Sequence, residues 1–348
     1  MKHILHIATV LVFVFILSCT PRKTHYTKSY YADRGVIFNT FLNVKYEASE
    51  SLTDKIYAEL EAFGLSLNPF IPNSIVSKVN RNEDVELDHW FTTVFNKSMD
   101  VSAVSGGAFD VTAAPLINLW GFGFEHSDNI SQHAIDSIRQ FVGYHKVRIE
   151  KNRVVKDDPR IKFNFSAIAK GYACDVIASL LEREGVENYM VDIGREVVAK
   201  GKNSDGNCWR IGINKPEDDS TGYIDELECI VRLCDKIGFA TSGNYRNYYI
   251  KDGKKISHTI DPHTGYPSEK SILSATVICN DCMAADAYAT AFMVMGVEEA
   301  NRLAESIPEI KHYFLIYSDE GSPSGYKIKH SKGMESILNN VGLKNFRK

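Results

Sequence analysis

Four short clusters in this 348-residue sequence carry residue types that bind phosphates, aromatic rings or hard cations, and only their conjunction is specific. The first, residues 105–112, reads Ser-Gly-Gly-Ala-Phe-Asp-Val-Thr. Its two glycines let backbone amides approach a ligand closely, Phe109 offers a flat face to an aromatic ring, and Asp110 can accept hydrogen bonds from ring or ribose donors. A glycine turn beside a core phenylalanine explains the same pattern.

The second cluster, residues 164–172, reads Asn-Phe-Ser-Ala-Ile-Ala-Lys-Gly-Tyr at a predicted strand-to-helix junction. The free amides of a helix start favour an anion, and Lys170 in the first turn could add a positive charge for a phosphate. A lysine there opposes the positive end of the helix macrodipole, which favours a ligand-binding role. The glycine spacing fits neither a Walker loop nor a Rossmann fingerprint, and an ordinary helix cap by Ser166 explains the cluster equally well.

The third cluster, residues 257–267, reads Ser-His-Thr-Ile-Asp-Pro-His-Thr-Gly-Tyr-Pro and follows a polar strand. Its prolines and glycine favour a fixed turn that could hold His258 and Asp261 in place. A histidine in such a turn could act as a general base near neutral pH. The alternative is a turn capped by Asp261 with an incidental histidine.

The fourth cluster, residues 284–290, lies on a predicted helix and contains Asp286 and Thr290. Residues four apart share one face of a helix, one turn from each other. A carboxylate and a hydroxyl so placed supply two oxygen ligands for magnesium, which keeps waters and substrate phosphates in its other positions. Ordinary electrostatics at a helix start, with a core threonine, is the competing interpretation.

The elements expected around these clusters come in blocks without strict alternation, which favours an α+β fold with mixed or antiparallel sheets and flanking helices. Apolar periodicity predicts helices over 52–63, 90–104, 131–142, 168–184 and 284–295, before an α/β tail. Alternating or short apolar runs predict strands over 35–48, 146–150, 160–165, 189–193, 197–202, 209–214, 227–233, 239–242, 248–251 and 274–279.

The N-terminus reads as an export signal, with Lys2 followed by an apolar run over 4–17 that is short for a membrane span. The run closes on Ser18-Cys19, which resembles a bacterial lipobox. We expect a signal peptide over 1–18, a lipid on Cys19 and a tether to the membrane over 19–34. An ordinary signal peptide with an incidental cysteine is the alternative.

A net charge of -4 and a pI near 6.3 argue against nucleic acid as a partner, so substrate phosphates must be met by local charges. Of the seven cysteines, six remain after Cys19, an even number that suits an oxidising compartment. The pair Cys279-x-x-Cys282 could indicate zinc or redox chemistry, but no second such pair or nearby histidine pair completes a zinc set. We expect core thiols or one or two disulfides.

Together and in this order, the clusters resemble the ApbE family of FAD:protein FMN transferases. The resemblance runs from about residue 35 to residue 296, and its most specific pieces are residues 106–116, 164–175, 241–246, 258–267 and 285–290. It implies one domain over 35–348, an α+β fold with two lobes and the flavin between them. The sequence departs from the family pattern with Phe-Asn-Thr at 38–40 in place of Met-Gly-Thr, Asn164 in place of Asp, and Arg195 in place of a second glycine.

The resemblance also implies roles for individual residues. His258 matches the catalytic histidine of the family, and Asp261 is a candidate to orient it. Magnesium would be held by the backbone oxygen of Ala167 and the side chains of Asp286 and Thr290. Contacts to FAD are expected from Phe38, Phe70, Ala108, Phe109, Asp110, Asn164, Lys170 and Ile260.

The implied reaction moves FMN from FAD onto a threonine or serine of another protein and releases AMP. The implied acceptors are exported or membrane flavoproteins, such as redox pump subunits, with a Ser/Thr-Gly-Ala-Thr-like motif, and a lipid on Cys19 would place the enzyme at the periplasmic or outer surface of a membrane. Two rivals are an FAD pyrophosphatase that yields FMN and AMP, and a non-catalytic FAD-binding lipoprotein. The presence of His258, Asp286 and Thr290 argues against simple binding, and an aromatic Phe70 favours transfer over hydrolysis.

Overall fold

The computed structural model describes residues 28–125, 130–217, 226–245, 247–251 and 253–339. The expected signal peptide, the lipid-bearing Cys19 and most of the expected tether lie outside these residues. Among the described helices, none combines the length and apolar character that a bilayer crossing requires.

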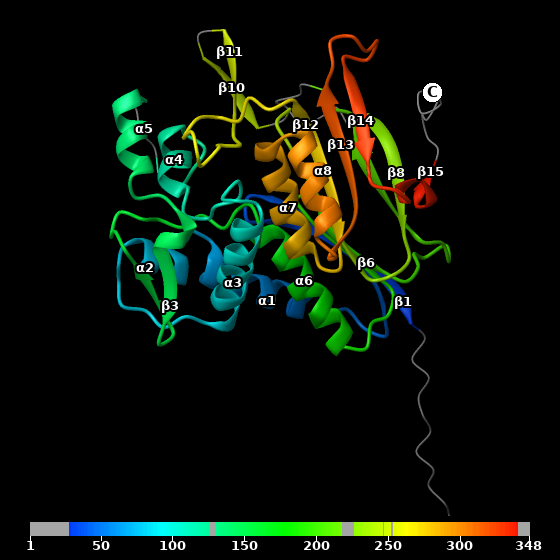
Figure 1. Ribbon diagram of the computed structural model, residues 1–348. Coiled ribbons are helices and arrows are strands. Elements are labelled where there is room, and N and C mark those ends of the chain that lie inside the picture. Colours follow the sequence, from blue (N-terminus) through cyan, green and yellow to red (C-terminus); the bar gives the residue numbers. More distant parts are fainter. Residues whose placement is uncertain (1–27, 126–129, 218–225, 246, 252, 340–348) are drawn as a thin grey trace, which may run out of the picture.

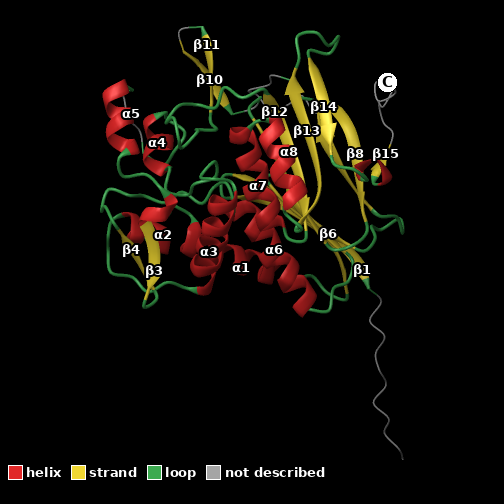
Figure 2. Ribbon diagram, viewed as in Figure 1, coloured by secondary structure: helices red, strands yellow, loops and turns green. Residues whose placement is uncertain are grey.

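An antiparallel sheet of eight strands forms the centre of the molecule, in the order β1-β2-β5-β6-β9-β12-β13-β14. Two helices, α6 (Ala169–Arg183) and α7 (Cys282–Met295), pack on one face (Figure 2). A sheet of three strands, β7 (Trp209–Asn214), β8 (Leu227–Leu233) and β15 (Leu338–Asn339), closes the other face. The strands of the central sheet are β1 (Ser29–Ile37), β2 (Thr40–Ala48), β5 (Tyr189–Ile193), β6 (Glu196–Lys200), β9 (Ile237–Gly243), β12 (Ile272–Cys279), β13 (Ile310–Ser318) and β14 (Tyr326–His330).

Side-chain alternation along the central strands feeds two separate cores. In β13 the consecutive residues Phe314 and Leu315 are both fully buried, Phe314 against the three-stranded sheet and Leu315 against the helices. Met190 and Val191 divide in the same way along β5. Successive side chains of a strand point to opposite faces, so both are buried only where both faces of the sheet are covered. Here the helices cover one face and the three-stranded sheet covers the other.

Most of the remaining elements lie on the helical side of the central sheet, whereas the 3-10 turn over Met334–Ser336 packs beside β15 on the other side (Figure 1). The helices are α1 (Thr53–Leu67), α2 (Ile75–Asn80), α3 (His89–Val104), α4 (Ala114–Leu119), α5 (Gln132–Arg139) and α8 (Val297–Ser306), with short 3-10 turns over Tyr144–Lys146 and Met334–Ser336. Two small hairpins complete the fold, β3 (Val147–Glu150) with β4 (Arg153–Lys156), and β10 (Tyr248–Lys251) with β11 (Lys254–Ser257).

The predicted α+β fold is confirmed, and all five predicted helices are present with shifted ends. The prediction of one strand over 35–48 is wrong, because β1 and β2 form a hairpin that turns at Phe38 and Asn39. These two residues have φ of 51° and 59°, the left-handed values of a two-residue type I′ turn. The strand β1 begins at Ser29, so six residues expected in the tether are paired with β2 instead.

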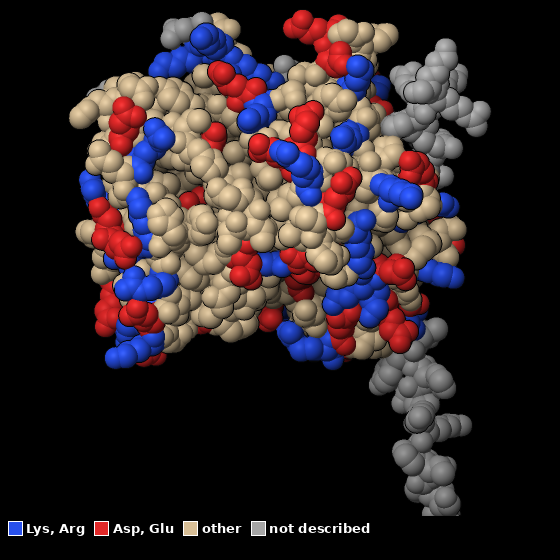
Figure 3. All heavy atoms as spheres, viewed as in Figure 1, with Lys and Arg blue, Asp and Glu red and all other residues tan. Residues whose placement is uncertain are grey.

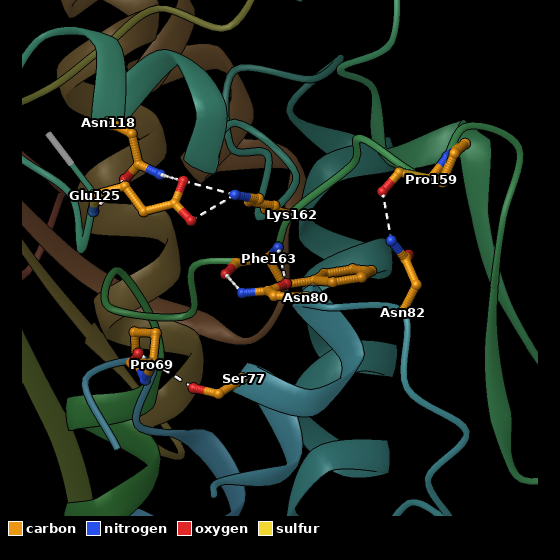
Figure 4. Close-up of polar contacts among 9 residues, drawn as sticks. All are labelled: Pro69, Ser77, Asn80, Asn82, Asn118, Glu125, Pro159, Lys162 and Phe163. Atoms are coloured by element: carbon orange, nitrogen blue, oxygen red, sulfur yellow. Dashed lines mark hydrogen bonds and ion pairs between the residues drawn. The ribbon is translucent and has the colours of Figure 1, made fainter. Parts of the chain in front are cut away.

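The strand predicted over 160–165 is also absent, although its apolar residues are buried. The side chain of Asn80 takes the place of a neighbouring strand: its Nδ2 donates to the Phe163 carbonyl at 2.9 Å, and its Oδ1 accepts from the Phe163 amide at 2.7 Å (Figure 4). A side-chain amide can satisfy both backbone groups of one residue, so this segment is fixed without a ladder.

The cysteines behave as the sequence indicated. Cys208 and Cys234 form a disulfide that joins the start of β7 to the end of β8. The other four described cysteines, Cys174, Cys229, Cys279 and Cys282, are free and buried. The pair Cys279-x-x-Cys282 is therefore part of the core, as expected.

Candidate functional site

One cavity of about 440 Å³ brings the four sequence clusters together. It is lined by eleven of the thirteen residues that the sequence singled out, namely Phe70, Ala108, Phe109, Asp110, Asn164, Ala167, Lys170, His258, Ile260, Asp286 and Thr290. Phe38 lines a second pocket beside it, and Asp261 lines neither. A cavity of this size with few convergent polar groups is typical of a small-molecule site.

The strongest charges of the cavity are one lysine and two buried carboxylates. Lys170 Nζ lies 3.1 Å from Glu196 Oε1 and 3.7 Å from Asp286 Oδ2. Burial by itself would lower the pKa of Lys170, but Asp286 and Glu196 together hold that pKa above its usual value. This pairing offsets the unfavourable position of Lys170 at the start of α6, so the lysine remains charged and faces the cavity.

Glu196 was missed by the sequence analysis, although it is 3% exposed and lines the cavity. Burial, and then the charge of Asp286, raise the pKa of Glu196 above its usual value, while the charge of Lys170 opposes this shift. Its Oε2 atom is buried without a hydrogen-bond partner in the described structure. A buried carboxylate oxygen with no partner is costly and indicates a site for a cation or a donor.

The position of Asp286 is fixed by the start of α6. Gly171 N–H donates to Asp286 Oδ2 at 3.0 Å, so the anion at this helix start is a side chain of the protein itself. A Cβ at Gly171 would lie 2.3 Å from the Cys282 carbonyl oxygen and 2.8 Å from the Asp286 Cβ. Glycine is therefore required at position 171 because α6 and α7 touch there.

The start of α7 is held by a second carboxylate from α6. Asp175 accepts from the amides of Cys282 at 2.9 Å and Met283 at 2.8 Å, while Asp281 caps the helix by accepting from the Ala284 amide at 2.7 Å. These contacts satisfy the first amides of α7 and complement its dipole. They fix the helix that carries Asp286 and Thr290.

The residues predicted to bind magnesium lie together at this cavity. Ala167, Asp286 and Thr290 all line it, and Thr290 Oγ1 lies 3.2 Å from Ser242 Oγ. In the described part of the chain, no group of three or more His, Cys, Asp or Glu side chains is placed to hold a metal ion. Carboxylate, hydroxyl and carbonyl oxygens are nevertheless the donors that magnesium prefers, and the unpartnered Glu196 oxygen adds another, so the donor set fits a hard cation.

His258 is kept neutral by its surroundings. Burial, with a further contribution from the charge of Lys170, lowers the pKa of His258 to about 4. Its Nδ1 lies 3.1 Å from the Asn247 carbonyl oxygen. Because that oxygen can only accept, the neutral tautomer carries its proton on Nδ1 and leaves the Nε2 lone pair available as a base.

The expectation that Asp261 orients His258 is corrected by these contacts. Asp261 Oδ1 accepts from the His263 amide at 2.9 Å and lies 3.0 Å from His263 Nδ1. The other ring nitrogen of His263 lies 2.9 Å from the Gly106 carbonyl oxygen. Asp261 therefore belongs to a bridge between two loops, and the orienting partner of His258 is the Asn247 carbonyl, which sequence patterns cannot show.

The glycine-rich cluster is a rigid turn. Asp110 Oδ1 accepts from the Thr112 amide at 2.8 Å and hydroxyl at 2.6 Å, and its Oδ2 accepts from the Tyr144 amide at 2.8 Å. Burial raises the pKa of Asp110 above its usual value, against these hydrogen bonds. Each oxygen of Asp110 thus already has a protein donor. The main role of this carboxylate in the structure is to hold the turn, and the expected contact to a ligand would come in addition.

A second pocket of about 270 Å³ adjoins the cavity and shares Phe70, Ser166 and Lys170 with it. Phe38 lines this pocket from the β1–β2 turn, with its ring 5.9 Å from that of Phe63. Phe70 is 66% exposed at the boundary, 6.4 Å from the ring of Phe124. Two pockets joined at a lysine can hold a molecule with two aromatic ends and a phosphate bridge.

The loop that carries Phe70 is tied to α2, as Figure 4 shows. Ser77 Oγ donates to the Pro69 carbonyl at 3.2 Å, and Ser74 caps α2 by accepting from the Ser77 amide. In the same view Lys162 forms an ion pair with Glu125, to which Asn118 also donates. The Ser77–Pro69 contact therefore holds the loop that carries Phe70 in place.

Further cavity residues outside the predicted set include Phe122, Ser242 and Asn247. Ser242 lies in the sequence piece over 241–246 that carried the family resemblance, so this signal was present. Asn247 acts through its carbonyl oxygen, and Phe122 packs behind His258 with ring centroids 6.3 Å apart. Neither role depends on a residue type that marks chemistry in a sequence.

Comparisons with known proteins agree with this geometry. The model of the ApbE family matches residues 38–314. A Vibrio cholerae protein named FAD:protein FMN transferase is 36% identical over 82% of this chain and 87% of its own length, and an Escherichia coli K12 protein of the same name is 32% identical over 85% and 88%.

Solved structures give the same result. The flavin transferase ApbE from Vibrio cholerae superposes with a TM-score of 0.78 and 33% identity, covering 89% of this chain and 100% of that structure. The ApbE protein from Thermotoga maritima has a TM-score of 0.77 and 26% identity, covering 90% of this chain and 100% of that structure.

Proposed function

The chain belongs to the ApbE family, and from that premise we propose that it is an FAD:protein FMN transferase that moves FMN onto a threonine or serine of an acceptor protein with the help of magnesium. The supporting observation is the single cavity, which joins a glycine-rich turn, a charged lysine, a neutral histidine and buried oxygen donors. The relatives that this chain matches over most of their length are named for this activity. Transfer of FMN is the function that this combination supports best.

FAD would occupy both pockets, with its pyrophosphate at the lysine that they share. Lys170 offers a positive charge there, next to the start of α6. The aromatic side chains Phe38, Phe70 and Phe109 supply flat apolar surface for the ring systems. The position of Phe70 in both pockets makes it the contact between the two halves of the ligand.

His258 acts as the general base in this proposal. Its neutral ring removes the proton from the incoming hydroxyl, the hydroxyl oxygen forms a bond to the phosphorus of the FMN half, and the bond from that phosphorus to the oxygen of AMP breaks. A low pKa limits the strength of this base, but it also keeps His258 unprotonated at neutral pH. The Asn247 carbonyl fixes the ring in one tautomer throughout.

Magnesium would be held by the Ala167 carbonyl oxygen, Asp286 and Thr290, with Glu196 nearby. When bound, it supplies Lewis-acid stabilisation of the charge that develops on the pyrophosphate. The residues of the chain keep this site in place: Gly171 orients Asp286, and Asp175 fixes the start of α7.

The nearest rival is an FAD pyrophosphatase, in which water replaces the protein hydroxyl. The exposed Phe70 at the boundary of the two pockets favours transfer, since an aromatic ring there can cover the flavin and exclude water. A non-catalytic FAD-binding protein would not need the buried oxygen donors of Asp286 and Thr290.

The proposal for the location of the protein rests on its N-terminal sequence. We propose that Cys19 carries a lipid and that the domain faces the periplasm or outer surface, where exported acceptors with a Ser/Thr-Gly-Ala-Thr-like motif, such as redox pump subunits, would be reached. Metabolic labelling of the wild type and of Cys19→Ser tests this. A lipid on the Cys19→Ser variant, or none on the wild type, would contradict the anchor.

The activity is tested by incubating the chain with FAD, magnesium and an acceptor domain bearing the motif, followed by a denaturing gel. We expect a fluorescent acceptor band that disappears with EDTA and with an acceptor whose motif threonine is replaced by alanine. A dark acceptor with free FMN and AMP would establish the pyrophosphatase instead. Intact FAD throughout, with measurable FAD binding, would establish a binding protein.

A further inference from the structure

A basic arm projects from the body beside the proposed site. The β10–β11 arm consists of β10 (Tyr248–Lys251) and β11 (Lys254–Ser257), which pair only with each other among the described residues. It stands out at the top of the molecule in Figure 1. An isolated two-stranded hairpin has little stability by itself, so its conformation depends on the contacts at its base.

One face of the arm packs against the body near the cavity. Tyr249 and Ile256 are cross-strand partners on this face. Tyr249 stacks on Phe122 with centroids 5.3 Å apart and donates to the Trp120 carbonyl at 3.2 Å, and Ile256 packs against the main core. Because Phe122 lines the cavity, the base of the arm is continuous with the cavity wall.

The opposite face carries one exposed apolar side chain and one exposed basic side chain. Ile250 and its partner Lys255 are both exposed, Ile250 to 62%. Lys255 Nζ lies 4.4 Å from the ring centre of Tyr248. Ile250 is thus an exposed apolar side chain beside one lysine on this face, and the Lys251–Lys254 pair follows on the other face at the tip. Exposed apolar and basic side chains next to each other resemble the composition of a small protein interface.

The tip of the arm concentrates positive charge. Residues 248–257 contain three lysines and one aspartate, a net charge of +2 in a chain whose net charge is -4. Lys251 and Lys254 are directly opposite each other in the register, and like charges in such a pair destabilise a hairpin. Figure 3 shows basic side chains gathered over the arm at the top of the molecule. A partner with negative charge would relieve this repulsion.

The arm also connects directly to the proposed base. Asn247, whose carbonyl contacts His258, precedes β10, and His258 follows β11. A protein that brings its hydroxyl to His258 therefore comes close to the base of the arm.

We propose that the β10–β11 arm is the docking element for the acceptor protein, and that it recognises an acidic surface next to the modified hydroxyl. This inference rests on the proposed transferase function. The arm steers the acceptor electrostatically and places its hydroxyl near His258, while FAD is bound by the cavity alone.

The test compares two acceptors: a negatively charged flavoprotein domain bearing the motif, and a short uncharged peptide with the same motif. For Lys251→Glu/Lys254→Glu in the full chain, we expect kcat/KM for the domain to fall by about tenfold at low salt. The peptide rate and the affinity for FAD should stay within about twofold, and the loss for the domain should shrink as salt rises.

Matched variants separate the effect of the arm from the effect of a change in the net charge of the protein. Lys311→Glu/Lys332→Glu introduces the same change at exposed lysines of the β13–β14 edge and should leave the domain rate within about twofold. Lys251→Arg/Lys254→Arg keeps the charge and should transfer FMN to the domain at the wild-type rate. Ile250→Ser should lower kcat/KM for the domain and leave the rate with the peptide unchanged.

Each outcome has a defined meaning. Equal losses for domain and peptide, or equal losses in the two double variants, would overturn the docking role and leave the transferase intact. Loss of binding to phosphatidylglycerol and phosphatidylcholine vesicles, with unchanged transfer to the domain, would overturn it in favour of a lipid surface. Absence of transfer by the wild type to both acceptors would overturn the proposed function and this inference with it.

Discussion

The two faces of the central sheet differ in how they use buried polar groups. The helical face contains both carboxylates that are almost fully buried in the described chain, Glu196 and Asp286, at 3% and 2% exposure, and each lies near Lys170. The other face is an apolar core closed by the three-stranded sheet and the Cys208–Cys234 disulfide. Burying charge costs stability even when the charges are paired, so the burial of Glu196 and Asp286 is better explained by the proposed ligand site than by the stability of the fold.

Both cores of the molecule are built on the same central sheet. The same strands supply both faces, because alternate side chains of one strand point to opposite sides. A substitution at a polar residue that lines the cavity, such as Asp286, should therefore affect chemistry more than stability, and a substitution in the core under the three-stranded sheet should do the reverse. The following predictions test this separation.

The largest expected effect is the loss of metal-dependent transfer in Asp286→Ala. This change removes the carboxylate that accepts from Gly171 and that Lys170 faces. We expect transfer to be abolished and the magnesium-dependent rise in melting temperature to disappear, with the fold retained. Asp286→Asn, which keeps an acceptor for the Gly171 amide, is the control for local structure. Full activity of either variant would remove Asp286 from the metal site.

Next in size is His258→Ala, for which we expect turnover to fall by about 10²–10⁴-fold. FAD affinity, measured by flavin fluorescence, should change little, because the aromatic and Lys170 contacts remain. Asp261→Ala is the matched comparison: it removes the contact to His263 and not to His258, so its effect on turnover should be much smaller. A reversed order of the two variants would restore Asp261 as the orienting residue.

On the apolar face, Phe314→Ala should reduce the free energy of unfolding by about 3–5 kcal/mol. Phe314 is fully buried in the second core, on the side of the sheet away from the cavity. Denaturant unfolding measures the loss, and transfer per folded molecule at low temperature should match the wild type. Phe314→Leu should cost less, and reduced FAD affinity in either folded variant would mean that the two faces are coupled.

Removal of the disulfide should have a smaller effect of the same kind. Cys208 and Cys234 are separated by 26 residues, and closing a loop of this size contributes about 2–4 kcal/mol. The Cys208→Ser/Cys234→Ser variant should unfold at a lower temperature and keep its transfer rate. Reductant should lower the melting temperature of the wild type to that of the variant and leave the variant unchanged.

The smallest effect concerns pH. The pKa of His258 is lowered to about 4, so the neutral base form persists as the pH falls from 7 to 5. Initial rates at saturating FAD and magnesium should therefore lack the decline near pH 6.5 that an unperturbed histidine would cause. A midpoint near pH 6.5 that vanishes in His258→Ala would show that the ring is more hydrated than the structure indicates.

Much of the fold followed from local pattern. The strands β5, β7, β8 and β10 have the bounds that apolar alternation predicted, because each is short and ends at turn residues. The two wrong strand predictions have different causes. Asn80, 83 residues away, takes the place of a strand partner for Phe163. The turn at Phe38 and Asn39 has no glycine to mark it. Local periodicity shows neither a distant side-chain partner nor a turn formed without glycine.

The sequence by itself determined which residue types are present for chemistry and most of the elements that carry them. It identified Lys170, His258, Asp286 and Thr290 because the clusters that contain them, together and in this order, resemble the motifs of one family. Only the tertiary structure decided the partners: Glu196 for Lys170, the Asn247 carbonyl for His258, and His263 for Asp261. Hydrogen bonds and ion pairs act over about 3 Å, and the fold alone decides which distant residues come within that distance.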